Sequence, residues 1–395
     1  MKILIASDSF KGCMSSQEAN RQIEKGILRA APDVQTETFA VSDGGEGMTE
    51  AFASLCKGEW HTTRVPDLYG RPIQAKWVYD PNSQTACMEA ASVIGLTLYG
   101  HGERNPLQAS SYGLGLLARD VLAHPEVKKL IIGLGGTGTN DGGMGFAAAF
   151  GAVFYDRTRQ PLAPCAANLS KIAFIDKRNF RPVRNKELIA ACDVSCHLLG
   201  SKGATHVFGR QKGLRPLQIV QTEQGMRQFH EKIDQTFHVR MNDFEGSGAA
   251  GGLGGMLIGV FHARMQSGIE ILEEGGLYEK IRDADYVFSG EGQTDAQSAC
   301  GKALSRMARI ASKADVPFVC VSGALGLGCE KMYQEGISAM FSTADRAMSF
   351  PCALAHGAQK LEQESYNLMR LILAAERKAK QRYAKQSGNT DRKEP

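Results

Sequence analysis

The segment that decides the fold is GLGGTGTNDGGMGFAAAFG, residues Gly133–Gly151. It follows an apolar run, Leu130–Ile132, which predicts the end of a buried strand, and it leads into an alanine-rich stretch typical of a helix. The glycines between them permit positive φ angles and a close approach of the backbone to a ligand. A strand, a glycine loop and a helix in that order indicate an α/β fold, with backbone N–H groups placed where an anion can bind.

Three further glycine-rich loops repeat this pattern. They are DGGEG at Asp43–Gly47, GSGAAGGLGG at Gly246–Gly255 and SGEGQTD at Ser289–Asp295. The recurrence favours a ligand site over plain turns, and we expect a small polar, phosphorylated ligand. None of the loops closes with Gly-Lys-Ser or Gly-Lys-Thr, and the first strand is not followed by Gly-x-Gly-x-x-Gly. Any nucleotide is therefore expected to bind without a Walker A loop or a dinucleotide fingerprint.

Both ends of the chain alternate short apolar runs with amphipathic stretches, which is typical of parallel strands joined by helices. Ser15 or Ser16 can cap the helix that follows the first strand. Five apolar runs predict one doubly wound, flavodoxin-like parallel sheet. The predicted strands are Lys2–Ala6, Thr38–Val41, Tyr286–Ser289, Phe318–Ser322 and Met340–Thr343.

The pattern changes between His61 and Ala91, where alternating runs are separated by turn residues. This change predicts antiparallel hairpins. We therefore expect a mixed α/β domain, residues 63–274, inserted into a flavodoxin-like domain of residues 1–62 and 275–385. A polar tail, residues 386–395, is predicted to be disordered. Ligands of open α/β sheets bind at the carboxyl ends of the strands, so the active site is expected in the cleft between the domains.

Composition excludes several classes of protein. The 395 residues carry a formal net charge of +4, too small for a strongly basic nucleic-acid-binding protein. The ten cysteines show no paired Cys-x-x-Cys spacing, which favours free thiols in a reducing compartment. No stretch has the pattern of a signal peptide or a membrane-spanning helix. We therefore expect a cytoplasmic protein that binds neither nucleic acid nor membrane, and the sequence leaves a homodimer open.

Eight motifs together resemble the glycerate kinases of the bacterial class I type. They occur in family order across nearly the whole chain, except for its C-terminal tail, and eight motifs in order are far more specific than one. The motifs are DSFKG at Asp8–Gly12, DGGEG at Asp43–Gly47, RNP at Arg104–Pro106, GGTGTNDGGMG at Gly135–Gly145, CD at Cys192–Asp193, FGxQKG at Phe208–Gly213, GSGAAGGLG at Gly246–Gly254 and SGEGQTDAQSACGKA at Ser289–Ala303.

Two segments depart from the family pattern. CHL at Cys196–Leu198 stands where the family has Asn-Pro-Leu, and GRQKG at Gly209–Gly213 stands where the family has Gly-Pro-Gln-Lys-Gly. Both segments lie in the expected inserted domain. They leave the implied reaction class intact and bear on substrate preference and loop geometry.

The resemblance implies an ATP-dependent kinase that phosphorylates a hydroxyl of D-glycerate with a divalent metal, Mg²⁺, on a two-domain fold. The expected product is phosphoglycerate, with 2-phosphoglycerate favoured over 3-phosphoglycerate. The alternative is a non-catalytic sensor of glycerate or of a sugar acid on the same fold. A sensor has no need for metal-binding carboxylates, so the acidic residues in the motifs argue for the enzyme.

Phosphoryl transfer requires a cation for phosphate, a site for the substrate carboxylate and a group that accepts the hydroxyl proton. Asp193 follows an apolar run directly, is expected to be partly buried, and is our choice for the proton acceptor, with Asp141 as the alternative. Lys11 lies in the loop after the first strand and can reach phosphate oxygens. The substrate carboxylate can be held by an arginine, and Arg104 is favoured over Arg64 and Arg71 because it lies in a motif. The expected substrate-binding residues are Asp8, Ser9, Arg104 and Asn140.

The remaining candidates bind phosphate or metal. Oxygen ligands suit Mg²⁺, so the carboxylates in the loops at strand ends are the expected metal ligands, although Asp43 could instead hydrogen-bond its own turn. The expected metal ligands are Asp43, Glu46, Glu291 and Asp295. The expected nucleotide- or phosphate-binding residues are Gly135, Gly136, Thr137, Thr139, Lys212, Gly251, Gly252 and Lys302.

Overall fold

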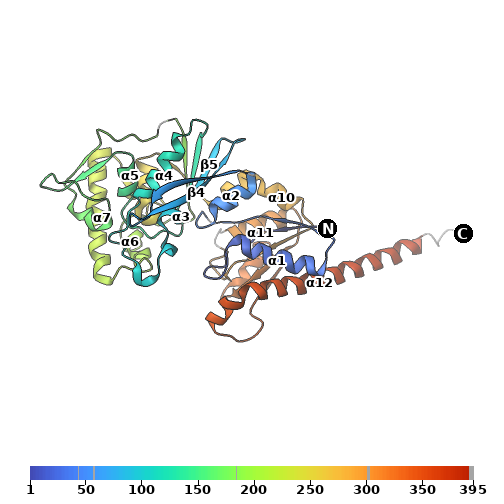
Figure 1. The fold of residues 1–395 in the computed structure, drawn as a ribbon. Helices are drawn as coiled ribbons and strands as arrows, with labels where there is room; N and C mark the ends of the chain where they lie inside the picture. The colour runs from blue at the N-terminus through green and yellow to red at the C-terminus, as the bar shows by residue number, and fades with distance from the viewer. Residues whose placement is uncertain (43, 57, 184, 300–302, 391–395) are drawn as a thin grey trace. The chain divides into compact units, whose positions relative to one another are not determined.

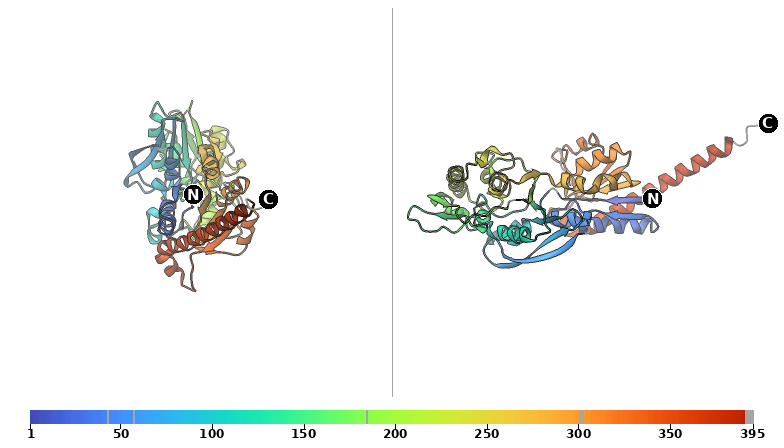
Figure 2. Two further views of the ribbon diagram at one scale, coloured as in Figure 1. Left: turned by 90° about the vertical axis from the view of Figure 1, so that its right-hand side faces the viewer. Right: turned by 90° about the horizontal axis from the view of Figure 1, so that it is seen from above.

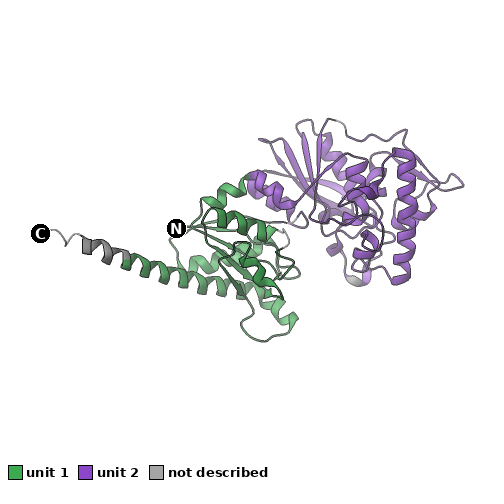
Figure 3. Ribbon diagram, turned by 180° about the vertical axis from the view of Figure 1, so that it is seen from behind, with its two compact units in different colours: residues 1–41, 276–395 green, residues 42–275 purple. Residues whose placement is uncertain are grey.

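The computed structural model describes residues 1–42, 44–56, 58–183, 185–299 and 303–390, which form a mixed α/β protein with parallel sheets (Figure 1). The chain divides into two compact units (Figure 3). Unit 1 comprises residues 1–41 and 276–395, and unit 2 comprises residues 42–275. The first division therefore falls well before the expected residue 62. The reason is helix α2 (Met48–Cys56), which packs against strands and a helix of unit 2.

Unit 1 contains a five-stranded parallel sheet with helices. Its strands are β1 (Lys2–Ile5), β2 (Gln35–Thr38), β11 (Tyr286–Ser289), β13 (Phe318–Ser322) and β15 (Ala339–Ser342), with β12 (Gln293–Thr294) and β14 (Ala324–Leu325) forming a separate parallel pair. Its helices are α1 (Ser16–Ala30), α10 (Tyr278–Arg282), α11 (Ala303–Lys313) and α12 (Phe350–Thr390).

The strands of the unit 1 sheet lie in the order β15-β13-β11-β1-β2, and all neighbours are parallel. Ile3 of β1 pairs with Tyr286 of β11 on one side and with Thr36 of β2 on the other. Strand β2 lies three residues before the predicted Thr38–Val41. The apolar residues Phe39 and Val41 are buried after the strand has ended, which explains the misplaced prediction.

Helix α1 begins with a capping box. The Ser15 hydroxyl accepts a hydrogen bond from the Glu18 backbone N–H, and the Glu18 carboxylate accepts one from the Ser15 N–H. Helix α1 packs against α12, and the views in Figure 2 show the rest of α12 running on beyond α1. Gly26 lies so close to the Glu362 carbonyl that a Cβ would clash there. Helix α12 continues to Thr390, so residues 386–390 of the expected disordered tail are helical, and residues 391–395 lie outside the described part.

Unit 2 is built on a six-stranded mixed sheet. Its strands are β3 (Glu59–Pro66), β4 (Pro72–Asp80), β5 (Thr85–Glu89), β6 (Lys129–Gly133), β9 (Glu187–Ala191) and β10 (Arg264–Gln266), with a separate hairpin of β7 (Val153–Tyr155) and β8 (Phe174–Asp176). Its helices are α2, α3 (Ala91–Ile94), α4 (Tyr112–Ala123), α5 (Met144–Ala149), α6 (Ala204–Phe208), α7 (Pro216–Phe237), α8 (Leu253–Gly259) and α9 (Gly268–Leu272).

The unit 2 sheet has the order β10-β9-β6-β5-β4-β3. Strands β10, β9, β6 and β5 are parallel neighbours, whereas β5, β4 and β3 form antiparallel hairpins. The antiparallel hairpins predicted between His61 and Ala91 are therefore confirmed. The glycine loop of Gly133–Gly143 joins the central strand β6 to α5, as its sequence predicts.

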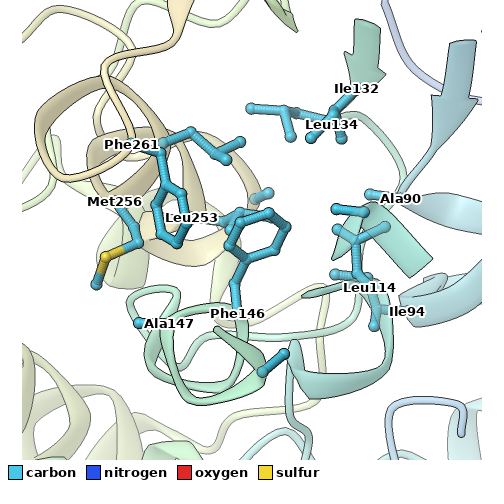
Figure 4. Close-up of a cluster of buried hydrophobic side chains, with 14 of the residues drawn as sticks. Ala90, Ile94, Leu114, Ile132, Leu134, Phe146, Ala147, Leu253, Met256 and Phe261 are labelled. Atoms are coloured by element: carbon cyan, nitrogen blue, oxygen red, sulfur yellow. The ribbon is translucent and has the colours of Figure 1, made fainter. Parts of the chain in front are cut away.

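A buried hydrophobic cluster fixes the helices of unit 2 against the sheet (Figure 4). Phe146 of α5 is 1% exposed and packs edge-to-face against Phe261, with ring centroids 5.0 Å apart. Leu134, the first residue after β6, and Leu253, the first residue of α8, belong to the same cluster. Truncation of such a buried phenylalanine to alanine typically costs ~3–5 kcal/mol. The core therefore reaches directly under the glycine loop and holds its two ends.

Two expectations from composition can be compared with the structure. Nine cysteines in the described residues are free thiols. No helix in the described part of the chain is long and apolar enough to cross a membrane.

Candidate active site

The glycine loop after β6 packs against other backbone so closely that several of its positions have no room for a side chain. A Cβ on Gly135 would clash with the Gly45 Cα, and a Cβ on Gly44 would lie 2.8 Å from the Ala191 carbonyl carbon. Gly143 precedes α5 with φ +77°, a left-handed conformation that favours glycine. The loop after β6, the segment around Gly44 and the end of β9 therefore meet through their backbones.

Asp141 organises this loop from the inside. Its carboxylate is fully buried and accepts hydrogen bonds from the Ser111 N–H and hydroxyl (both 2.8 Å), the Gly143 N–H (3.0 Å) and the Gly145 N–H (3.1 Å). Burial raises the pKa of Asp141, and the hydrogen bonds oppose that rise. Three of the four donors are backbone groups of the loop ends and of the residue before α4. The carboxylate thus fixes the start of α5 relative to the start of α4.

The glycine segment before α8 interlocks with the loop after β6. Ala250, Gly251 and Gly252 all have positive φ angles, and the Gly251 carbonyl accepts a hydrogen bond from the Gly142 N–H at 2.9 Å. A Cβ on Gly251 would clash with the Thr139 carbonyl. Two loops that are far apart in the sequence therefore form one rigid backbone surface.

Lys212 lies behind this surface. Its side chain is 2% exposed, and its ammonium donates a hydrogen bond to the Thr139 carbonyl at 2.6 Å. Burial lowers the pKa of Lys212 to about 8, against the opposing effects of Asp141 and Cys196. A buried cation with a lowered pKa is typical of a functional site.

A cavity of about 100 Å³ opens beside Lys212. Four residues expected to bind nucleotide or phosphate line it, namely Gly135, Gly136, Thr137 and Lys212. Its other walls are Leu96, Leu134, Cys192, Val194, Phe208, Gln211, Ala249 and Ala250.

Asp193, the expected proton acceptor, lies between two cavity-lining residues, Cys192 and Val194. Its side chain is exposed, so the expectation that it is partly buried is wrong. Strand β9 ends at Ala191, and Asp193 is therefore already outside the sheet. This exposed position suits a carboxylate that exchanges a proton.

Arg104 and Asn140, both expected to bind substrate, lie in unit 2. The Arg104 guanidinium donates to the carbonyls of Tyr99 and Gln211, each at 3.3 Å, and Gln211 lines the cavity. Asn140 is fully buried, and its amide donates to the Thr205 hydroxyl at 3.1 Å. The Asn140 Oδ1 and Thr139 Oγ1 atoms are buried without a hydrogen-bond partner.

The segment Cys196–Leu198, one of the two that depart from the family pattern, contacts the glycine stretch of unit 2. Leu198 N donates to the Ser247 hydroxyl at 3.0 Å, and Gly248 N donates to the Cys196 carbonyl at 2.9 Å. A Cβ on Gly248 would lie 2.6 Å from the Cys196 Sγ. The segment is therefore held against the glycine stretch that precedes α8.

A second group of expected residues gathers at the carboxyl ends of β1 and β11 in unit 1. Asp8 N donates to the Gly290 carbonyl at 2.9 Å, and the Asp8 carboxylate accepts a hydrogen bond from Ser9 N at 2.6 Å. A Cβ on Gly292 would lie 3.4 Å from Lys11 N, so the two loops are neighbours. The side chain of Lys11 is exposed.

Glu291 is held by hydroxyl groups. Its Oε1 atom accepts hydrogen bonds from Thr294 Oγ1 at 3.0 Å and from Ser298 Oγ at 2.6 Å. Thr294 Oγ1 also lies 2.7 Å from Ser322 Oγ. Asp295 accepts from the Gln297 backbone N–H at 2.8 Å. The two carboxylates thus occupy one ordered loop after β11.

The other expected residues are placed differently. Glu46 is exposed in unit 2. Asp43 and Lys302 lie outside the described residues. Within the described ranges, no three His, Cys, Asp or Glu side chains form a cluster that could hold a metal ion.

Some residues of unit 2 that contact the site were not predicted from the sequence as functional residues. Burial raises the pKa of Glu89 to about 7, with Glu50 adding to the effect. The Glu89 carboxylate accepts hydrogen bonds from Gly47 N at 2.9 Å and Thr49 N at 3.4 Å, at the start of α2. Ser111, which holds Asp141, and Phe208, which lines the cavity, were also not predicted for these roles. The sequence offered one signal for Glu89, namely an ionisable residue at the end of an apolar strand.

Known proteins resemble this chain over most of its length. The sequence profile of the glycerate kinase family matches residues 3–373. A glycerate kinase of Halalkalibacterium halodurans is 35% identical over 368 residues, which is 93% of this chain and 97% of the relative. The glycerate 2-kinase of Escherichia coli is 36% identical over 345 residues, or 87% of this chain and 90% of the relative.

A solved structure also matches. The crystal structure from Salmonella typhimurium LT2 that carries the name glycerate kinase 2 superposes with a TM-score of 0.79 at 32% identity, covering 95% of this chain and 99% of that one. Fold and sequence together define an α/β kinase. The chain belongs to the glycerate kinase family.

Proposed function

We propose that this protein transfers the terminal phosphoryl group of ATP to a hydroxyl of D-glycerate, with 2-phosphoglycerate as the favoured product. The family match over residues 3–373 supports glycerate as the acceptor, and the name of the Escherichia coli relative supports the 2-position. The observation that carries the proposal is the buried Lys212 beside interlocked glycine loops, because these supply a cation and backbone N–H groups for anionic substrates.

The loops at the strand ends are proposed to position phosphate. In unit 2 the backbone groups lie in the two interlocked loops, and in unit 1 Lys11 adds an exposed cation next to the loop after β11. Lys302 is assigned by its motif alone. The proposed phosphate-binding residues of unit 2 are Gly135, Gly136, Thr137, Thr139, Gly251 and Gly252.

Asp193 is the proposed general base. It is exposed and flanked by residues of the cavity wall, whereas all four hydrogen bonds of Asp141 are committed to the structure of the loop. A base must be able to reach the hydroxyl proton of the substrate. The exposed position of Asp193 therefore favours it as the general base, and Asp141 is the alternative.

A divalent metal, Mg²⁺, fits the carboxylates of unit 1. Mg²⁺ commonly binds one or two carboxylates and completes its coordination with phosphates and water, so a cluster of three side chains is not required. Glu291 and Asp295 lie in one loop of unit 1 and are the proposed ligands. Asp43 and Glu46 are proposed as ligands on their DGGEG motif alone. When bound, Mg²⁺ would neutralise charge on the phosphates.

Substrate binding is proposed for Asp8, Ser9, Arg104 and Asn140. Arg104 helps to build the cavity wall through its hydrogen bond to Gln211, and Asn140 retains an unpartnered buried oxygen. We further propose that unit 1 is flavodoxin-like, with unit 2 inserted into it. The strand order β2-β1-β11-β13-β15, which is 2-1-3-4-5 in chain order, supports this.

The deciding experiment is phosphorus NMR of the product formed from D-glycerate and ATP, together with a coupled assay of ADP release. We expect a resonance of 2-phosphoglycerate and one ADP per phosphoglycerate. A resonance of 3-phosphoglycerate would change the regiochemistry and leave the kinase assignment intact. Binding of D-glycerate without ADP release would support the non-catalytic sensor instead.

A further inference from the structure

The cavity beside Lys212 is small. Its volume is about 100 Å³. Pockets for larger ligands span roughly 300–1,000 Å³. A nucleotide is therefore too large for this cavity, whereas a three-carbon acid matches its size.

Lys212 makes the cavity suitable for an anion. The ammonium has three donors, and the structure gives it one hydrogen bond, to the neutral carbonyl of Thr139. The carboxylate that acts on Lys212 is that of nearby Asp141, and its oxygens are already engaged by Ser111, Gly143 and Gly145. A buried charge without a paired partner is costly, so an anionic ligand beside Lys212 would be favoured.

Lys212 is the charged residue in the cavity wall. The buried Thr139 Oγ1 and Asn140 Oδ1 atoms, which have no hydrogen-bond partner, do not line this cavity. The remaining walls, which include Leu96, Val194 and Phe208, suit a short carbon skeleton.

We propose that this cavity binds the carboxylate of the acceptor, with Lys212 as its counter-ion, and that its size selects three-carbon hydroxy acids over longer sugar acids. This inference rests on the proposed kinase function. It gives Lys212 the carboxylate rather than a phosphate. Arg104 contacts the carbonyl of Gln211, which lines the same cavity. Asp193 lies between Cys192 and Val194, which both line the cavity, so the proposed base is close to the proposed anchor.

The test compares Lys212→Met with the matched control Lys202→Met, an exposed lysine of the same unit. We expect Lys212→Met to raise KM for D-glycerate by roughly 10- to 100-fold, as for loss of a hydrogen bond to a charged group, with KM for ATP unchanged within about twofold. In a thermal-shift assay with D-glycerate alone, the stabilisation seen for wild type and Lys202→Met should be lost. A rise in KM for ATP with unchanged D-glycerate binding would overturn the proposal.

A second pair of variants tests the cavity without touching Lys212. Val194→Phe should fill the cavity and raise KM for D-glycerate, and Phe208→Ala should improve turnover of a four-carbon hydroxy acid, D-erythronate, relative to D-glycerate. If neither change alters acceptor preference, the acceptor lies elsewhere, even if Lys212→Met fails to fold. If the wild-type protein does not phosphorylate D-glycerate, the proposed function itself is refuted. If the wild-type protein is active and the variants keep its acceptor preference, only the cavity proposal is refuted.

Discussion

The substitutions Asp141→Asn and Asp193→Asn separate a carboxylate that holds the loop from one that takes a proton. Asp141 Oδ2 accepts three hydrogen bonds and Oδ1 accepts one, from Gly143 N. An asparagine can keep its oxygen at the Oδ2 position, but its NH₂ group then faces the Gly143 N–H. The loss of one buried hydrogen bond to a charged group costs ~1.5–3 kcal/mol. For a unit of residues 42–275, this corresponds to a fall in Tm of roughly 5–10 °C.

Asp193→Asn is expected to behave differently. Asp193 is exposed, so its replacement should change the free energy of unfolding less than that of the fully buried Asp141. Loss of general-base catalysis should lower kcat by roughly 10²- to 10⁴-fold. The assays are differential scanning calorimetry and steady-state kinetics with D-glycerate and ATP. If Asp193→Asn keeps its kcat while Asp141→Asn loses kcat at unchanged Tm, the assignment of the two carboxylates is reversed.

Three other outcomes are expected. Activity should disappear with EDTA and return with Mg²⁺, because the carboxylates of Glu291 and Asp295 are the proposed metal ligands, and full turnover in metal-free buffer would contradict this. Because the pKa of Glu89 is about 7 in the fold against an ordinary 4.5, its ionisation costs stability as pH rises through this interval, by at most about 3 kcal/mol. Glu89→Gln should therefore flatten the decline in denaturant stability between pH 5 and pH 8, and an unchanged decline would refute this origin. Truncation after Arg382 should leave kcat unchanged, because the family match ends at residue 373 and Arg382 is exposed. A truncated protein that is soluble but inactive would show that the end of α12 is needed.

Much of the fold follows from local sequence patterns. The strands that begin at Lys2, Tyr286 and Phe318 were predicted from apolar runs, and the hairpins from alternation between turn residues. Strand β2 was misplaced because Phe39 and Val41 are buried beyond the end of the strand, and burial alone does not distinguish these positions. The division between the units was expected near residue 62, since nothing in the sequence of α2 shows that it packs on unit 2.

For the candidate site, too, some features follow from the sequence and others only from the tertiary structure. The sequence by itself determined where the glycine loops lie and which residues they carry, because a loop that needs positive φ or close backbone contact requires glycine at that position. Only the tertiary structure decided that Lys212 is buried against the Thr139 carbonyl, that Asp141 is engaged by Ser111, and that Asp193 is exposed. Burial, pKa and hydrogen bonding of these side chains depend on groups from distant segments, which only the folded chain brings together.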